Sequence, residues 1–425
     1  MGGQRLGRSR AAAKARLGAV DRPLAVLSLA GFVSQVGVAV MLPLLPLYAT
    51  LLGASPFVLG LLTSAFAVLN TIGQLGVGLL SDRFGARRMV PTGLGIYAAA
   101  NALIATATSA LPLVAFRSLA GFGGGMAIVA ERVYLARSTP AHRLAFTNGI
   151  LSAAQSAGTV TGPAVAGFLA AASDLRVPFV LVAVTSLVAF GGTLFLPREP
   201  AAATAPARAT AIVPGDGAGE DAARAIPSAS GKPPVRTALR PIVALLLANL
   251  ALQAGFGAFI TTYAPFSTTR LGWSTAEVGI VFSLFGAGSI LLGPWLSRLA
   301  DRHGRRLIAI LGTVPVIAWG VILVLGLPSP VIWAESILAG GGLTAFGAAW
   351  YALLSEASPA GRQGRTFGFV SAISTLGIVV GAIAASTLWE AVDIAAGPLI
   401  ASIAVAAAIP ALLALPRARP STAAA

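Results

Sequence analysis

The sequence has no cysteine and only two histidines among its 425 residues. Without cysteine the chain has no disulfide, no thiolate nucleophile and no cysteine metal site. The two histidines, His142 and His303, leave little for a histidine metal centre, so we expect neither a metal nor a cofactor. Charge is scarce as well, because 10% of the residues are charged and 56% are hydrophobic. Soluble domains are about 25% charged, so this composition excludes a soluble enzyme.

The few charges that are present are mostly positive, with a formal net charge of +15. In a soluble protein this excess would suggest a nucleic-acid partner. With a mean hydropathy of +0.85 it is more typical of a membrane protein whose cytoplasmic loops are basic. We therefore expect a lipid bilayer around the chain and no nucleic-acid partner.

Apolar runs of membrane-spanning length recur along the chain, and a spanning helix needs about 20 residues. The runs cover residues 23–48, 57–80, 90–108, 111–130, 146–171, 178–196, 241–263, 275–296, 307–325, 330–354, 367–388 and 395–415. Barrel strands would alternate polar and apolar residues over about ten positions, and these runs do not. The first run is too long for a cleaved signal. The sequence therefore predicts an all-α membrane protein with twelve transmembrane helices.

Basic residues are distributed unequally between the two sides of these spans. All lysines and arginines except Arg117, Arg176 and Arg270 fall in the tails or in the loops on one side. Because basic loops stay in the cytoplasm, we expect a multi-pass protein of the cytoplasmic cell membrane with both termini inside.

The expected domains follow from composition. Residues 1–22 form a basic cytoplasmic tail, 23–197 and 241–415 form two six-helix bundles, and 416–425 form a second tail. Residues 198–240 are rich in Ala, Pro, Gly and charge, and such a stretch cannot bury enough apolar surface to fold alone. It is therefore interpreted as a flexible cytoplasmic linker.

The two halves repeat each other at an offset of 219 residues: Asp82 matches Asp301, Arg87 matches Arg306 and Pro140 matches Pro359. Clusters of Asp, Arg, Pro and Gly at one offset do not arise from low complexity. The repeat predicts two pseudo-symmetric bundles that enclose a site near the bilayer midplane, with access alternating as they rock.

Charged motifs follow the second and eighth spans, as Gly78-Leu-Leu-Ser-Asp82-Arg83-Phe-Gly85-Ala-Arg87 and Ser297-Arg-Leu-Ala-Asp301-Arg302-His-Gly304-Arg305-Arg306. The pair resembles the signature of the major facilitator superfamily, and span number and repeat agree over nearly the whole chain. Ala86 and Ser297 depart from the family pattern. The resemblance implies the major facilitator fold, a transporter that is not an enzyme, and a monomer. It also implies a cytoplasmic gate formed by Gly78, Asp82, Arg83, Gly85, Arg87, Asp301, Arg302, Gly304, Arg305 and Arg306.

In this gate Asp82 would face the start of the eleventh helix near Thr366, and Asp301 the start of the fifth near Thr147. The alternative is that the charges only retain topology, which explains the arginines but neither Asp nor Gly.

Three charges within the spans are candidates for proton coupling. Arg117 opens a stretch similar to the family's R-x-x-x-G-x-G motif, and its alternative role is snorkelling to the outer surface. Glu335 lies at the matching depth of the tenth helix and is a candidate partner for Arg117. Glu131, at the inner end of the fourth helix, would pair with the loop arginines, or else only solvate that helix end.

The fifth helix carries Gly149, Gly158, Gly162, Pro163 and Gly167. This spacing resembles the antiporter motif of twelve-helix drug:proton exporters, with Ala166 in place of one glycine. Pro163 favours a kink that the second half lacks, because the matching residue there is Ala382. The alternative is ordinary close packing of small residues.

In the family the first, fourth, seventh and tenth helices line the path. Polar candidates for the substrate cavity are Gln35, Gln155, Asn249, Gln253, Trp350 and Tyr351, which could also serve as interhelical hydrogen-bonding groups. The first helix has no acidic residue, which disfavours cationic solutes and favours neutral, lipophilic or amphipathic ones.

The sequence thus predicts a secondary transporter that exports a small lipophilic or amphipathic molecule in exchange for protons. The alternatives are a nutrient symporter or facilitator of the same fold, an intramembrane enzyme, and a receptor of this fold that does not transport. No HExxH motif, Ser–His pair or paired carboxylates occur within a span, which disfavours the enzyme.

Overall fold

The computed structural model describes residues 22–139, 143–197, 235–359 and 363–415, and within these ranges the chain forms helices and no strand. The helices are α2 (Arg22–Leu51), α3 (Pro56–Phe84), α4 (Ala86–Ala105), α5 (Ala110–Ser138), α6 (Leu144–Ala172), α7 (Val177–Leu194), α8 (Val235–Arg270), α9 (Thr275–His303), α10 (Arg305–Val324), α11 (Ser329–Ala357), α12 (Gln363–Ala391), α13 (Ala396–Ala406) and α14 (Ala408–Leu413).

These helices match the predicted spans in order and place, which confirms the predicted fold class. With α13 and α14 taken as one, 10 of the described helices are long and apolar enough to cross a membrane. The remaining long helices, α4 and α6, are more polar along their length. One boundary differs, because α8 begins at Val235, inside the stretch expected to be linker. The rest of that stretch, residues 198–234, lies outside the described residues, as do the tails 1–21 and 416–425.

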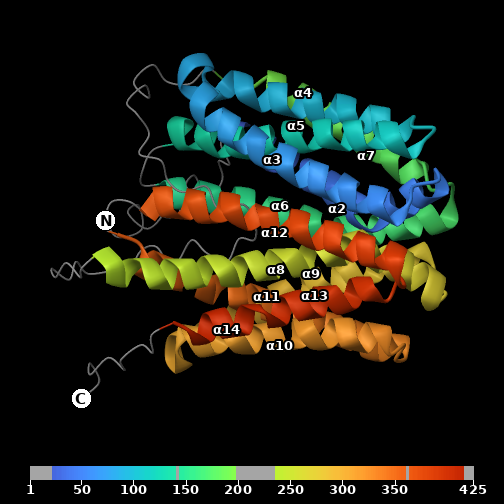
Figure 1. Ribbon diagram of the computed structural model, residues 1–425. Helices are drawn as coiled ribbons and strands as arrows, with labels where there is room; N and C mark the ends of the chain where they lie inside the picture. The colour runs from blue at the N-terminus through green and yellow to red at the C-terminus, as the bar shows by residue number, and fades with distance from the viewer. Residues whose placement is uncertain (1–21, 140–142, 198–234, 360–362, 416–425) are drawn as a thin grey trace, which may run out of the picture.

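The helices form two bundles, α2–α7 and α8–α14, which Figure 1 shows one above the other. We call the end of the molecule that carries Gly85, Gly304 and Leu415 the inner end, and the opposite end, with Gly53 and Asp393, the outer end. Each bundle holds two clusters of buried apolar side chains, one toward each end. The tightest side chains of the N-terminal bundle include Tyr48 and Phe179, whose ring centroids lie 4.7 Å apart.

Helix ends repeat between the two bundles. Ser55 caps α3 by accepting a hydrogen bond from the Val58 N–H, and Ser274, 219 residues later, forms a capping box on α9 with Glu277. Gly85 and Gly304 join the next helix pairs with φ of 79° and 96°, a region that side-chain-bearing residues rarely adopt. The same local signals therefore end the same helices in both halves.

The repeat extends to tertiary contacts. Arg87 Nε donates to the Leu196 carbonyl oxygen at 2.7 Å, and Arg306 Nη1 donates to the Leu415 carbonyl oxygen at 2.6 Å, with both partners shifted by the same 219 residues. In each bundle an arginine of the inner loop is thus fastened to the end of the last helix. These equivalent contacts confirm the prediction of two pseudo-symmetric six-helix bundles.

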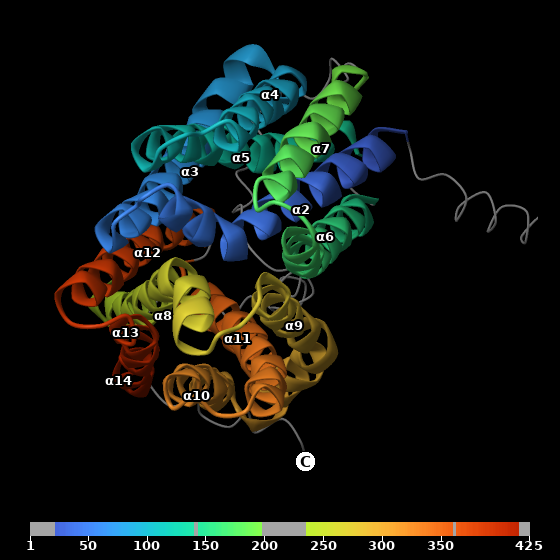
Figure 2. The ribbon, with the colours of Figure 1, turned by 90° about the vertical axis from the view of Figure 1, so that its right-hand side faces the viewer.

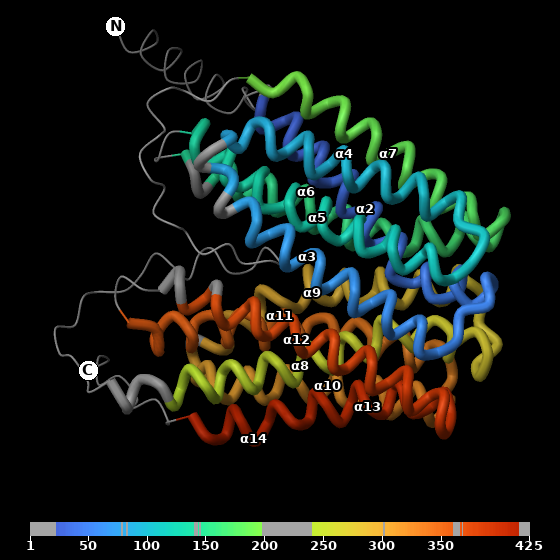
Figure 3. The backbone as a smooth tube through the Cα atoms, turned by 45° about the horizontal axis from the view of Figure 1, so that its top comes forward, coloured from blue at the N-terminus to red at the C-terminus, as the bar shows by residue number. Residues whose placement is uncertain are grey.

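The bundles meet along two helix pairs, α3 with α12 and α6 with α9. Figure 2, which looks onto the outer end, shows α3 beside α12 and α6 above α9. In Figure 3 the ribbons of the two bundles come together toward the outer end, at the right, and diverge toward the inner end. The outer ends of the bundles are therefore closed against each other.

Candidate functional site

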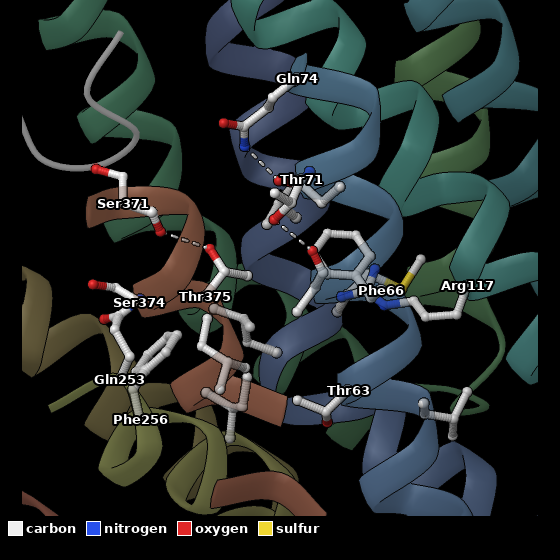
Figure 4. Close-up of a pocket in the computed structure, with 18 of the residues that line it drawn as sticks. Thr63, Phe66, Thr71, Gln74, Arg117, Gln253, Phe256, Ser371, Ser374 and Thr375 are labelled. Atoms are coloured by element: carbon white, nitrogen blue, oxygen red, sulfur yellow. Dashed lines mark hydrogen bonds between the residues drawn. The ribbon is translucent and has the colours of Figure 1, made fainter. Parts of the chain in front are cut away.

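A cavity of about 540 Å³ lies between the two bundles, on the inner side of the outer closure. It extends from Leu59 and Ile260 to Leu75 and Ser371. Figure 4 shows its wall, with side chains of α3 facing those of α8 and α12 and with Arg117 reaching in from α5. Its volume lies within the range of about 300–1,000 Å³ that is typical of small-molecule sites.

Half of the predicted cavity residues lie on this wall. Asn249, Gln253 and Tyr351 line it. Gln35 instead donates to Thr159 Oγ1 at 3.3 Å, between α2 and α6. The other two candidates also pack within one bundle, because Gln155 bonds to α5 residues and Trp350 Nε1 donates to the Leu245 carbonyl oxygen at 2.8 Å. A buried polar group needs a partner, and these three find theirs inside a bundle rather than in the cavity.

Sequence reasoning missed the polar contribution of α3 and α12. These helices present hydroxyl and amide groups at helical spacing, which are Thr63, Asn70, Thr71, Gln74, Ser371, Ser374 and Thr375. Asn70 Nδ2 is committed to the Gly121 carbonyl oxygen at 3.1 Å, and its Oδ1 accepts from Gln74 at 2.6 Å. The signal was available, since polar residues three, four and seven apart share one helix face.

Arg117 is the one charged residue among the described cavity-lining residues. Its side chain is 4% exposed, and its guanidinium carbon lies 3.8 Å from the centre of the Phe66 ring. Burial of this kind excludes the snorkelling alternative. The structure does not pair Arg117 with Glu335, which is partly exposed on α11 and does not line the cavity.

Glu131 is 1% exposed and lies inside the N-terminal bundle. Its carboxylate accepts a hydrogen bond from Gln155 Nε2 at 3.2 Å, and Arg132 Nη2 donates to the other end of the same amide at 3.5 Å. The solvated alternative is therefore wrong. In this arrangement Glu131 bonds to Gln155, while Arg87 of the inner loop is bound to a backbone carbonyl.

The glycine motif of α6 serves two neighbours. A Cβ at Gly158 would lie 2.4 Å from the Phe32 carbonyl oxygen, and one at Gly162 would lie 2.9 Å from that of Val36, so these glycines admit α2. A Cβ at Gly167 would lie 2.4 Å from the Thr275 carbonyl oxygen of α9, in the other bundle. Gly149 faces open space. Close packing thus explains part of the motif, and the part around Pro163 faces the second bundle.

The two contacts between bundles are equivalent under the repeat, and we call them the seams. In one seam a Cβ at Gly279 would lie 2.3 Å from the Pro163 carbonyl oxygen, and in the other a Cβ at Gly60 would lie 2.9 Å from the Ala382 carbonyl oxygen. Ser283 donates to the Val160 carbonyl oxygen at 2.9 Å, and Ser64 donates to that of Val379 at 3.4 Å. These pairs lie in the outer halves of their helices, where they hold the outer end closed.

The seams differ at the proline. Ser283 Oγ, besides donating to the Val160 carbonyl, accepts from the Ala164 N–H at 3.1 Å. These two backbone groups are four residues apart, the spacing at which a helix pairs them with each other, and they flank Pro163. A hydroxyl from α9 therefore bonds to the turn of α6 that contains the proline.

The predicted gate lies at the inner end. Gly85 and Gly304 form the turns, Arg87 and Arg306 bind carbonyl oxygens, and Arg305 pairs with Glu356 within the C-terminal bundle. Arg302 is exposed. The remaining members are Gly78, Asp82, Arg83 and Asp301, whose side chains lie outside the described part of the chain.

Comparisons with known proteins place these features in context. The model of the Major Facilitator Superfamily matches residues 27–270 and 245–425. Quinolone resistance protein NorA of Staphylococcus aureus is 25% identical over 271 residues, which is 63% of this chain and 65% of that protein. The chain thus matches slightly less than two thirds of this relative's length.

Solved structures share the fold. The nucleoside transporter NupG aligns with a TM-score of 0.73 at 12% identity, covering 92% of this chain and 99% of that one. A bacterial homolog of the human lysosomal transporter Spinster, in an inward-facing and unoccupied conformation, aligns with a TM-score of 0.66 at 16% identity, covering 93% and 94%. Its inward-facing form agrees with the closed outer end seen here.

Proposed function

Because the chain belongs to the Major Facilitator Superfamily, whose members are membrane transporters and not enzymes, we propose that it exports a small lipophilic or amphipathic molecule in exchange for protons. The observation that carries this proposal is the cavity between two pseudo-symmetric bundles that are closed at one end. A site of this kind is reached from alternate sides as the bundles rock. The similarity to quinolone resistance protein NorA supports export.

The inner end is assigned to the cytoplasm of a cell membrane. Basic residues gather on that side, where the loop arginines Arg87, Arg88, Arg305 and Arg306 lie. The positive-inside rule then places both tails and the 198–234 stretch in the cytoplasm. In this arrangement the cavity takes solute from the cytoplasm, and a monomer contains the complete path.

The exchange between states is assigned to the two seams and the inner gate. Opening the outer end breaks the Ser283–Val160 and Ser64–Val379 hydrogen bonds. Closing the inner end brings Asp82 toward the start of α12, and Asp301 toward the start of α6, where the helix N-terminal N–H groups attract a carboxylate. Each state thus gains contacts that the other loses, as two-state transport requires.

Proton coupling is assigned to Glu131. Its carboxyl is shielded from water in the inward-facing form and bonds to Gln155 of α6, the helix that also carries Pro163. A movement of α6 against α5 would break that bond and admit water, so the carboxyl exchanges a proton as the conformation changes. Arg117 stays protonated and cannot carry the proton itself. Glu335 lies away from the cavity and is the weaker candidate.

A second candidate is a nutrient symporter or facilitator of the same fold. The observation that favours it is the wall of α3 and α12, whose hydroxyl and amide groups, such as Thr71, Gln74 and Ser374, suit a polar solute. Apolar side chains from α2 and α8, such as Met41, Leu42, Phe256 and Ile260, cover the rest of the cavity and favour an amphipathic one.

Transport into everted membrane vesicles separates these candidates. An antiporter accumulates solute only when protons are concentrated inside the vesicle, and it releases protons in step with uptake. A facilitator equilibrates solute without a gradient, and a symporter accumulates it under the reverse gradient. Vesicles with Asp82→Asn protein are the control for carrier-mediated flux. Solute uptake that ignores the proton gradient would refute proton-coupled export.

A further inference from the structure

Arg117 is a buried cation without a counter-ion. It lies in the outer third of α5, where its Nη1 makes no hydrogen bond although the atom is inaccessible to solvent. An unpaired buried donor loses its water without gaining a partner, and a charged one loses most. An apolar side chain would fill the same space without that cost. The position therefore has the chemistry of a site that awaits an acceptor.

The orientation of the side chain leaves its donors available. Phe66 contacts the flat face of the guanidinium group, with the carbon 3.8 Å from the ring centre. The N–H donors of an arginine lie in the plane of the group and point outward from its edge. Stacking on Phe66 thus fixes the plane without using a donor. Figure 4 shows the side chain extending from α5 toward Phe66 at the cavity wall.

The rest of the cavity offers Arg117 no acidic partner. The described lining residues include amides, hydroxyls and apolar side chains, but no Asp or Glu. In a low-dielectric site a lone positive charge attracts anions and repels cations far more strongly than it would in water. The net field in the cavity therefore selects the sign of the solute charge.

We propose that Arg117 binds the carboxylate of an amphipathic monoanion, so that the solute class of this protein is organic acids with an apolar body. The inference rests on the proposed function as a small-molecule transporter. The planar fork of the guanidinium matches a carboxylate with two parallel hydrogen bonds. The apolar body then lies against Met41, Leu45 and Phe256, which line the same cavity.

A pair of matched probes tests the inference by binding alone. The full chain in nanodiscs of zwitterionic phosphatidylcholine is titrated calorimetrically at about pH 7 with 1-naphthylacetate and with 1-naphthylacetamide, and the heats of empty nanodiscs are subtracted. The two probes have the same body and differ in charge. A charge-assisted hydrogen bond corresponds to a preference of about tenfold to hundredfold for the acid.

Three variants locate the preference. Arg117→Gln should bind both probes alike, with affinity for the amide within about threefold of wild type. Arg117→Lys should keep part of the preference, because it keeps the charge and loses the fork. Arg176→Gln removes one positive charge from the exposed outer loop and should behave as wild type. Size-exclusion profiles and unfolding temperatures report whether each variant is folded.

Equal affinity of the wild-type protein for the two probes, or no binding of the acid, would overturn the inference without any variant. So would an unchanged preference in folded Arg117→Gln. The outcome is separable from that of the proposed function, because binding does not require transport. A protein that binds the acid but moves no protons contradicts the export proposal alone, and a proton-coupled exporter indifferent to the probes contradicts the Arg117 inference alone.

Discussion

Replacement of Gly279 by alanine should open the outer end of the molecule. The new Cβ would lie 2.3 Å from the Pro163 carbonyl oxygen and 3.1 Å from the Gly167 Cα, whereas ordinary contact begins at 3.4 Å. Both neighbours are backbone, so α6 and α9 must separate by about 1 Å in the closed seam. Overpacking of this kind costs about 1–3 kcal/mol.

The cost applies only while the outer end is closed. It therefore shifts the balance between inward-facing and outward-facing forms by a factor of about 5 to 150 toward the outward-facing one. The natural chain has no cysteine, so thiol labels can be placed without first removing any. Spin labels at Leu51→Cys and Val392→Cys, which are exposed at the outer ends of opposite bundles, report the separation.

The matched control is Gly76→Ala, because a Cβ at Gly76 meets nothing within 4 Å. Both substitutions replace a glycine within a helix and share the same gain in helix propensity, about 1 kcal/mol. Pulsed electron–electron resonance should show longer label distances for Gly279→Ala than for Gly76→Ala. Identical distance distributions would refute the assignment of this seam to the outer closure.

Four further predictions concern single side chains. Ser283→Ala removes two hydrogen bonds and should open the outer end more than Ser64→Ala, which removes one long one; equal label distances would contradict this. Asp82→Asn should stop turnover in vesicles while the protein stays inserted and folded, and normal flux would exclude the gate. Glu131→Gln should flatten the pH dependence of transport, and an unchanged profile would exclude Glu131 as the proton site. The pKa of Asp393 is lowered by a backbone N–H two residues further on and then by a neighbouring guanidinium, so its stabilising effect is present above the ordinary pKa of 3.8 and is lost as the pH falls through the lower folded value. Unfolding temperatures of wild type and Asp393→Asn should converge in acid, and a constant difference would contradict that linkage.

The fold was predictable because membrane helices are written in long apolar runs, and because the repeat brings independent support. The helix ends were less so. α5 continues to Ser138 and α8 begins at Val235, beyond the apolar runs 111–130 and 241–263. An apolar run marks the part of a helix that crosses hydrocarbon, whereas the hydrogen-bonded helix continues into polar sequence at the inner end. The break at Ala407 between α13 and α14 also left no signal in the apolar pattern.

The cavity was only partly predictable because a polar side chain within a span has two ways to be satisfied. Gln155 bonds to Glu131 inside a bundle, whereas Gln253 faces the cavity, and both look alike in sequence. Which one occurs depends on the rotation of the helix about its axis, which packing sets. The seam serines were within reach of sequence reasoning, since Ser64 and Ser283 also match at the offset of 219.

The proline in only one seam has a consequence for how the bundles swing. Pro163 deprives the carbonyl oxygen of Thr159 of its usual intrahelical donor, while Ala382 leaves α12 with a complete ladder. A helix with a missing rung bends more easily than an unbroken one. The two crossings therefore share a shape but not a stiffness, and the motion between states is hinged: α12 acts as a rigid post against α3, and α6 flexes as the leaf that yields.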